Sequence, residues 1–140
     1  MGNYTELVLG VELTSEPTVI DTLKRMLDNN AKNKVVTINH PLFSTTRWAY
    51  MLLGDSYYFD GQTDSKLVYD TTSKSYYLNV RCNLKNYDDE IGKFLDWLCP
   101  YIKTEGFLGY SRYECDADPT LIYKEGGEIR KCYEEREVER

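Results

Sequence analysis

The sequence predicts an α+β fold, a two-layer sandwich in which two amphipathic helices cover one face of a mainly antiparallel sheet. Several segments alternate apolar and polar residues with the period of a strand, and short turns join them. Apolar residues at helical spacing occur in two segments. Tyrosine, which favours strands and packs half-buried with its hydroxyl group in water, occurs 13 times in 140 residues. Antiparallel strands with so few helices indicate a sheet that is covered on one side only.

The first two elements are a strand and a helix. Residues 4–13, YTELVLGVEL, alternate apolar and polar side chains and predict a half-buried strand. Ser15 then offers a capping hydroxyl group, and Pro17 suits the first turn of a helix because its missing N–H has no partner there. An amphipathic helix over 17–28 is predicted by the spacing of Val19, Ile20, Leu23, Met26 and Leu27.

The middle of the chain reads as a long connection followed by strands. Residues 31–46 have little periodicity. The stretch RWAYMLLGDSYYFDG predicts a strand over 47–53, a Gly-Asp turn and a short second strand that ends at Phe59. The segments KLVYD and SYYLNVRCNL, separated by a Thr-Thr-Ser turn, predict a hairpin.

The last third predicts a second helix and a meander. Asp88 begins the helix, and Asp89 and Glu90 lie in its first turn, where the positive end of the helix dipole favours acidic side chains. Its apolar stripe consists of Ile91, Phe94, Leu95, Leu98, Tyr101 and Ile102. The turns DADP and EGG then separate two or three further strands. This order predicts a ferredoxin-like variant with extra hairpins, formed by a single domain over 1–133 and followed by a charged tail over 134–140.

The charge and the hydropathy pattern limit the partners. The net charge of -6 argues against direct binding to nucleic acid or to an anionic membrane, because both need a basic patch. The start of the chain lacks the pattern of a signal peptide, and the longest apolar run is no longer than a strand. We therefore expect a cytoplasmic protein without a membrane partner.

A polar and aromatic surface is predicted on the sheet face opposite the helices. In the strand over 76–84, Cys82 and its apolar neighbours turn toward the helices, and the alternate residues turn away. In the strand over 107–115, we expect alternate residues from Leu108 to Glu114 to lie on this face and Phe107 to point inward. Leu108 is apolar, so its expected position on a polar face is the one conflict in the pattern. The candidate binding residues on this face are Tyr77, Asn79, Arg81, Asn83, Tyr110 and Arg112.

Three interpretations of this face stay open. Protein-binding surfaces have this composition, and nucleotides are bound by the same residue types through stacking and phosphate pairing. The face can also be an ordinary sheet surface whose arginines pair with Glu6, Glu12 and Glu114. A third interpretation is burial of the face in a homodimer, which agrees with the large number of tyrosines.

The remaining polar clusters favour structural roles. Neighbouring acids such as those over 88–90 point in different directions, so they suit a helix start better than a pair of catalytic carboxylates. The stretch CDADP lacks the ligand spacing of a calcium loop and predicts a turn. His40, the one histidine, is expected to be a surface or capping residue. The four cysteines lack the CxxC pattern of zinc sites and are expected to be reduced, half-buried thiols.

Motifs of enzymes are not found in the chain. GxSxG, GxGxxG and the phosphate-binding P-loop are absent from the sequence. We therefore expect a protein that is not an enzyme, with no catalytic residues, no metal and no cofactor.

Four stretches, YTELVLGVEL, SYYFDG, LKNYDDEIGKFLDWLCPYI and GYSRYECDADPTLIY, resemble a group of small hypothetical proteins encoded by bacteriophages and prophages of Gram-positive bacteria. The resemblance implies an accessory protein made in the cytoplasm of the infected bacterium. With the absence of catalytic motifs, it suggests a counter-defence protein that binds and blocks a host protein or protein complex of immunity, such as a CRISPR effector. The alternatives are sequestration of a small nucleotide signal, within one chain or between subunits, with Arg81, Arg112 and a tyrosine as a clamp, and a small prophage enzyme.

Overall fold

The structure, a computed structural model, describes residues 3–29 and 36–133. Its strands are β1 (Thr5–Leu13), β2 (Lys66–Asp70), β3 (Ser75–Leu84), β4 (Gly106–Tyr113), β5 (Thr120–Glu125) and β6 (Glu128–Tyr133). Its α-helices are α1 (Pro17–Met26) and α2 (Glu90–Leu98), and its short 3-10 helices are η1 (Pro41–Ser44), η2 (Trp48–Leu53) and η3 (Cys99–Tyr101).

The strands of this part of the chain form one antiparallel sheet in the order β2-β3-β1-β4-β5-β6. Strands β1 and β2 run parallel with β3 between them, and α1 lies in the connection from one to the other. Strands β3 and β4 likewise run parallel with β1 between them, and α2 lies in their connection. These two split βαβ units are the ferredoxin-like arrangement, which β5 and β6 extend at the β4 edge. The predicted α+β sandwich is therefore confirmed.

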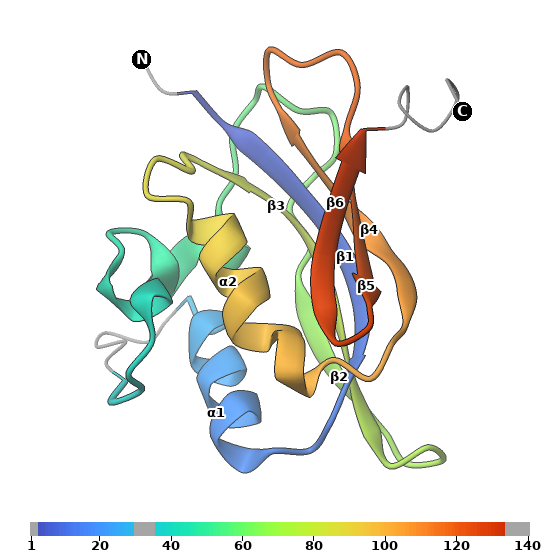
Figure 1. Cartoon of the computed structure of the whole chain (residues 1–140). Coiled ribbons are helices and arrows are strands. Elements are labelled where there is room, and N and C mark those ends of the chain that lie inside the picture. Colours follow the sequence, from blue (N-terminus) through green and yellow to red (C-terminus); the bar gives the residue numbers. More distant parts are fainter. Residues whose placement is uncertain (1–2, 30–35, 134–140) are drawn as a thin grey trace.

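The alternation of β1 separates the two faces of the sheet. Leu7, Leu9, Val11 and Leu13 are buried, and they form one hydrophobic core with the apolar residues of both α-helices. Figure 1 shows both helices on the same side of the sheet. We call the opposite side the open face; it consists of the even-numbered residues of β1 and the residues that lie beside them on the other strands. Gly10, at the middle of β1, is exposed there.

The two helix starts differ slightly from the prediction. The cap of α1 is the carboxylate of Glu16, not the hydroxyl group of Ser15, because Glu16 accepts the hydrogen bond from the backbone N–H of Thr18 at 3.1 Å. Helix α2 begins at Glu90, two residues after Asp88.

The prediction for residues 47–59 is wrong. Trp48–Leu53 forms the 3-10 helix η2, with Trp48, Met51 and Leu52 buried. An apolar run without clear alternation does not distinguish a buried strand from a buried helical turn, so the sequence pattern could not settle this segment. The short strand predicted to end at Phe59 is also absent, since residues 54–64 contain no strand and form turns and bends over 57–61.

The hairpin and the meander are present as predicted, and β5 and β6 complete the sheet. Among the residues that the structure describes, no helix is both long enough and apolar enough to cross a membrane. The charged tail predicted for 134–140 lies outside the described residues.

Candidate binding surfaces

The register of the sheet places the six predicted binding residues on the open face. Directly paired residues of antiparallel strands point to the same side of a sheet. Val8 of β1 pairs with Arg81 of β3 and with Tyr110 of β4. The other members follow in the same register, with Asn83 and Arg112 beside Glu6, Asn79 beside Gly10 and Tyr77 beside Glu12. The shared face is therefore confirmed, whereas its role in binding stays a prediction.

A β-bulge after Phe107 in β4 resolves the conflict in the sequence pattern. Leu108 is buried in the core, and Phe107 is 54% exposed. Tyr110 lies on the open face and pairs with Leu121 of β5. Tyr123 follows two residues later on β5, so it lies on the same face, and so does Phe107, which pairs with it. The outward placement of Leu108 and the inward placement of Phe107 were wrong, since a bulge inserts one residue and reverses the alternation beyond it.

Residues 54–64, which contain the SYYFDG stretch, cover one end of the open face. Phe59 of this segment is buried, and so are two polar strand residues of the same end, Glu6 and Asn83. Ser56 Oγ donates a hydrogen bond to Asn83 Oδ1 at 2.5 Å, and the backbone N–H of Asn83 donates to the carbonyl oxygen of residue 54 at 3.1 Å. The face that was predicted to be open is therefore covered at the end where β1 begins and β3 ends.

The two arginines of the predicted surface are each held by partners within the chain. The Nη1 atom of Arg81 donates to Oε2 of Glu6 at 3.2 Å. The guanidinium group of Arg112 lies 5.0 Å from the ring centroid of Phe59, and its Nη1 atom donates to the carbonyl oxygen of Asp116 at 3.4 Å. These contacts fix both side chains to the covered end of the sheet.

The part of the face that stays uncovered contains a hollow of about 480 Å³, which we call the open-face hollow. Val8, Asn79 and Arg81 line it from the sheet, and residues 62–64 form one wall. Arg112 is not among its lining residues. Within one chain, the two arginines therefore do not line the same hollow, and a nucleotide clamp between subunits stays a prediction.

A second surface lies at the end of the sheet where β1 begins, and aromatic and basic side chains from four separate segments form it. We call it the tyrosine surface; it consists of Tyr4, Arg47, Tyr50, Tyr57, Tyr58, Lys85 and Tyr87. Tyr57 is 89% exposed, Tyr87 is 56% exposed, Tyr50 is 50% exposed and Tyr58 is 41% exposed.

Ring contacts connect Tyr57, Tyr58, Tyr4 and Lys85 in one group and Arg47 with Tyr87 in a second. The rings of Tyr57 and Tyr58 stack with centroids 4.7 Å apart, and the ring of Tyr58 lies 5.5 Å from that of Tyr4. Lys85 Nζ lies 5.9 Å from the Tyr4 ring centroid. The hydrogen bond with Tyr57 raises the pKa of the Tyr58 hydroxyl group. Such stacked and cation–π contacts hold exposed rings in defined positions.

A hollow of about 290 Å³ opens within this surface, and we call it the Lys85 hollow. Tyr4, Tyr50, Arg47, Lys85 and Asn83 are among its lining residues. Lys85 makes no ion pair with any residue that the structure describes. Asn83 is 1% exposed, and because its Oδ1 atom accepts from Ser56, the other polar group of this side chain is its amide nitrogen. The hollow therefore offers two hydrogen-bond donors beside aromatic rings.

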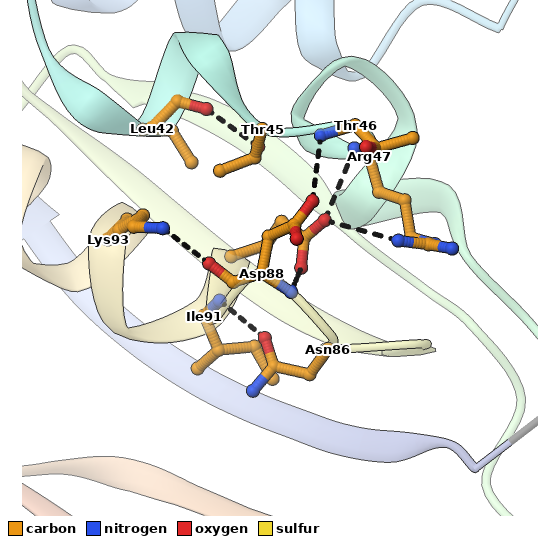
Figure 2. Close-up of polar contacts among 9 residues, drawn as sticks. Leu42, Thr45, Thr46, Arg47, Asn86, Asp88, Ile91 and Lys93 are labelled. Carbon is orange, nitrogen blue, oxygen red and sulfur yellow. Dashed lines mark hydrogen bonds and ion pairs between the residues drawn. The ribbon is translucent and has the colours of Figure 1, made fainter.

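A polar network at the start of α2 holds two of the surface segments in place, as Figure 2 shows. Asp88 Oδ2 accepts from the backbone N–H of Thr46 at 3.2 Å, and Lys93 Nζ donates to the carbonyl oxygen of Asp88 at 2.6 Å. The buried carboxylate of Glu90 accepts from the backbone N–H of Arg47 at 3.2 Å and lies 3.7 Å from its guanidinium group. The hydrogen bond from Thr46 is the main cause that lowers the pKa of Asp88.

This network decides where the adjoining aromatic residues lie. It joins the segment that carries Arg47 and Tyr50 to the segment that carries Tyr87. The guanidinium group of Arg47 lies 5.1 Å from the ring centroid of Tyr87. Of the acids over 88–90, Asp89 serves the helix start, as predicted, whereas the carboxylates of Asp88 and Glu90 tie a second loop to it. Asp89 is the helix cap itself, with its side chain accepting from a backbone N–H at 3.2 Å.

His40 is a capping residue, as predicted. Its Nδ1 atom accepts from the backbone N–H of Leu42 at 3.0 Å, and its Nε2 atom lies 2.9 Å from Oδ2 of Asp96. Because Nδ1 is an acceptor, the neutral ring carries its proton on Nε2 and donates it to Asp96. Both ring nitrogens therefore have structural partners.

The cysteines differ in exposure, in contrast to the four half-buried thiols that were predicted. Cys82 and Cys99 are buried, Cys132 is half-buried and Cys115 is exposed. Burial raises the pKa of Cys82 to about 12. Within the described part of the chain, no group of three or more His, Cys, Asp and Glu side chains has an arrangement that could hold a metal ion.

The tyrosine surface could not be found from strand parity. Its members come from the start of β1, from η2 and the residue before it, from the 54–64 segment and from the connection after β3. The abundance of tyrosine was the one signal in the sequence that pointed to such a surface. Comparison of the chain with protein-family models, with curated proteins and with solved structures finds no match.

Proposed function

We propose that the protein acts by binding a partner protein stoichiometrically, and that the tyrosine surface makes the contact. The observation that carries this proposal is the gathering of four exposed tyrosines, Tyr50, Tyr57, Tyr58 and Tyr87, around two basic side chains. Contiguous exposed aromatic patches mark interaction sites, and tyrosine and arginine are enriched among the residues that contribute most of the binding energy.

The surface is also prepared for binding. A tyrosine side chain has two rotatable bonds, so ordering it on binding costs little conformational entropy. Tyr57 and Tyr58 are already stacked on each other, and Tyr87 is covered on one side by Arg47. Side chains that are held in place before binding lose less freedom when the partner arrives.

The Lys85 hollow indicates what the partner presents. Lys85 and the amide nitrogen of Asn83 are donors, and the rings of Tyr4 and Tyr50 lie beside them. A carboxylate or a carbonyl group on an aromatic or aliphatic side chain fits this combination, because the acceptor end meets the donors and the apolar part meets the rings. We therefore expect an acidic or amide-bearing side chain of the partner to enter the hollow.

The biological role that we propose is counter-defence in an infected bacterium. The resemblance to phage and prophage proteins supports this role, and so does a binding surface in a chain without the common catalytic motifs. The partner would be a protein complex of host immunity in the cytoplasm, such as a CRISPR effector, which the bound protein would block.

A second candidate is sequestration of a small nucleotide signal. It is favoured by the Lys85 hollow, where a base could stack on a tyrosine ring and a phosphate group could meet Lys85. This site differs from the predicted pair of Arg81 and Arg112, which do not line one hollow.

The test is a plating assay with a matched surface variant. Bacteria that carry a CRISPR system directed at a phage would express the wild type, the double variant Tyr57→Ser/Tyr58→Ser or the control Tyr69→Ser. Tyr69 is 47% exposed but lies on β2, away from the tyrosine surface. We expect the wild type and the control to restore plaque formation and the double variant to lose the effect, since truncation of two central aromatic residues weakens binding by about 100-fold or more.

Two results would contradict this proposal. If the folded double variant restores plating as well as the wild type does, the tyrosine surface is not the contact. If the wild type changes plating on no defended strain and recovers no immunity complex from these cells, the role in counter-defence is wrong. A heat-released nucleotide in the purified protein would instead support the second candidate.

A further inference from the structure

Strand β2, at one edge of the sheet, is apolar at its middle. In the part of the chain that the structure describes, β2 pairs with β3 on one side and has no strand on the other. Val68 and Tyr69 are each 47% exposed. Proteins commonly protect such an edge with a proline or a β-bulge, because a free edge pairs with other chains. Strand β2 has neither, and its charged residues stand at its two ends.

The pairing with β3 determines which backbone groups of β2 point away from the sheet. In an antiparallel pair, opposite residues alternate between those that exchange both backbone hydrogen bonds and those that exchange none. The backbone N–H of Asp64 donates to the carbonyl oxygen of Arg81 at 2.8 Å, and these two residues continue the β2–β3 register. Every second residue from Asp64 onward therefore bonds to β3. Leu67 and Tyr69, which lie between them, turn their N–H and C=O groups outward.

We propose that a second copy of this chain pairs with β2, so that the two β2 strands run antiparallel about a two-fold axis perpendicular to the sheet at Val68. In this register, Leu67 lies opposite Tyr69 of the second copy, and the two residues exchange backbone hydrogen bonds. The same exchange occurs on the other side of the axis, because the contact is symmetric. All the outward backbone groups of these two residues are then paired.

The side chains of β2 are self-complementary in this register. Lys66 lies opposite Asp70 of the second copy, and Val68 meets its own copy. Pairs of opposite charge and pairs of an aromatic with an aliphatic side chain stabilise antiparallel strands. The two neighbouring registers with the same backbone bonds are less favourable, since Asp70 would lie opposite Asp64 in one and opposite Val68 in the other.

The charged groups at both ends of β2 are available for this contact. Lys66 Nζ lies 3.8 Å from Asp64, and the two side chains are 58% and 69% exposed, so the ammonium group stays accessible. The carboxylate of Asp70 accepts from the backbone N–H of Thr72 and from the hydroxyl group of Ser73, each at 3.0 Å. A carboxylate has about four acceptor sites, so Asp70 can also accept from a lysine.

Neighbouring segments leave room for the second copy. A hollow of about 420 Å³ separates α1 from Tyr69 on the helix side of β2, so the helix does not close over this edge. Residues 54–64 cover the end of the sheet where β1 begins. Because the two β2 strands are antiparallel, these covering segments lie at opposite ends of the contact. The tyrosine surface contains no residue of β2 and stays free in the dimer.

The test is the oligomeric state of the purified protein, measured by sedimentation equilibrium and native mass spectrometry from about 1 µM to about 1 mM. Strand β2 has five residues, so the contact is smaller than a standard interface, and we expect a dimer that dissociates at micromolar concentrations. Val68→Lys, Lys66→Glu and Asp70→Lys should each dissociate at least about tenfold more readily, because each places like charges opposite one another.

A mixture of two variants tests the register itself. Equal amounts of Lys66→Glu and Asp70→Lys should form a heterodimer about as tight as the wild-type dimer, since an acid again faces a lysine at both ends. The matched control is Lys131→Glu, the same charge change at an exposed residue of β6 on the opposite edge, which should dimerise like the wild type. Far-UV circular dichroism checks the fold of each variant, above all Asp70→Lys, which also loses hydrogen bonds in the turn.

Amide hydrogen exchange, followed by NMR, locates the contact. The N–H groups of Leu67 and Tyr69 should exchange at least about tenfold more slowly in the dimer than in the monomer. The N–H of Val68 should change little, because it bonds to β3 in both states.

Three outcomes would overturn the proposal. The first is a wild type that is monomeric at every concentration, and the second is a folded Val68→Lys variant that dimerises as tightly as the wild type. The third is a dimer in which the exchange of the Leu67 and Tyr69 amides is unchanged or which Lys131→Glu dissociates, since the contact would then lie elsewhere. None of these measurements involves a host protein, so they are independent of the proposed function.

Discussion

Replacing Arg81 by alanine should destabilise the fold before it affects any binding. The side chain of Arg81 is 39% exposed, whereas that of its partner Glu6 is 6% exposed, so the substitution would leave a carboxylate in the covered end of the open face without its counter-charge. An unpaired buried charge is costly, and removal of one partner from a buried pair is strongly destabilising.

The geometry sets the size of the effect. At a separation of 3.2 Å, two unit charges attract by about 5 kcal/mol at an effective dielectric constant of about 20 and by about 1 kcal/mol in water. Because Arg81 is partly exposed and water would enter the space it leaves, we expect a loss of about 2 kcal/mol in the free energy of unfolding. For 140 residues this corresponds to a Tm lower by about 7 °C.

The assay is urea unfolding of Arg81→Ala, the double variant Glu6→Gln/Arg81→Ala and the control Arg130→Ala. The double variant should recover about half of the loss, since a neutral amide replaces the unpaired charge. Arg130 pairs with Glu125, but their side chains are 68% and 52% exposed, so its loss should cost less than about 0.5 kcal/mol. The reasoning is refuted if Arg81→Ala and Arg130→Ala lose the same amount.

Two further predictions concern titratable groups. Ellman's reagent should modify the exposed Cys115 in the folded protein and Cys82 only after unfolding, because burial holds the pKa of Cys82 at about 12; rapid modification of Cys82 in native buffer would contradict this. Because the pKa of Asp88 is lower in the folded protein, its carboxylate stabilises the fold above the unfolded pKa of about 3.9. This stabilisation is lost as the pH falls through the pKa of the folded state. The variant Asp88→Asn should thus have a lower urea midpoint than the wild type at pH 7 and a similar one in acid; a difference that is independent of pH would count against this assignment.

The fold could be predicted because its main elements follow simple periodicities. The strict alternation of β1 and the helical spacing in α1 and α2 each have a single favourable arrangement, in which the apolar side chains share one core. Turn residues between β2 and β3, and between β5 and β6, marked the hairpins.

The predictions that were wrong concern features that depend on contacts between segments far apart in the sequence. The bulge after Phe107 reversed the parity of one strand end, and its position is set by the pairing with β5 rather than by the sequence around it. Residues 54–64 have no periodicity, yet they cover Glu6 and Asn83 and so decide which part of the sheet face is open. The tyrosine surface depends on the same packing, since its segments are adjacent only after folding.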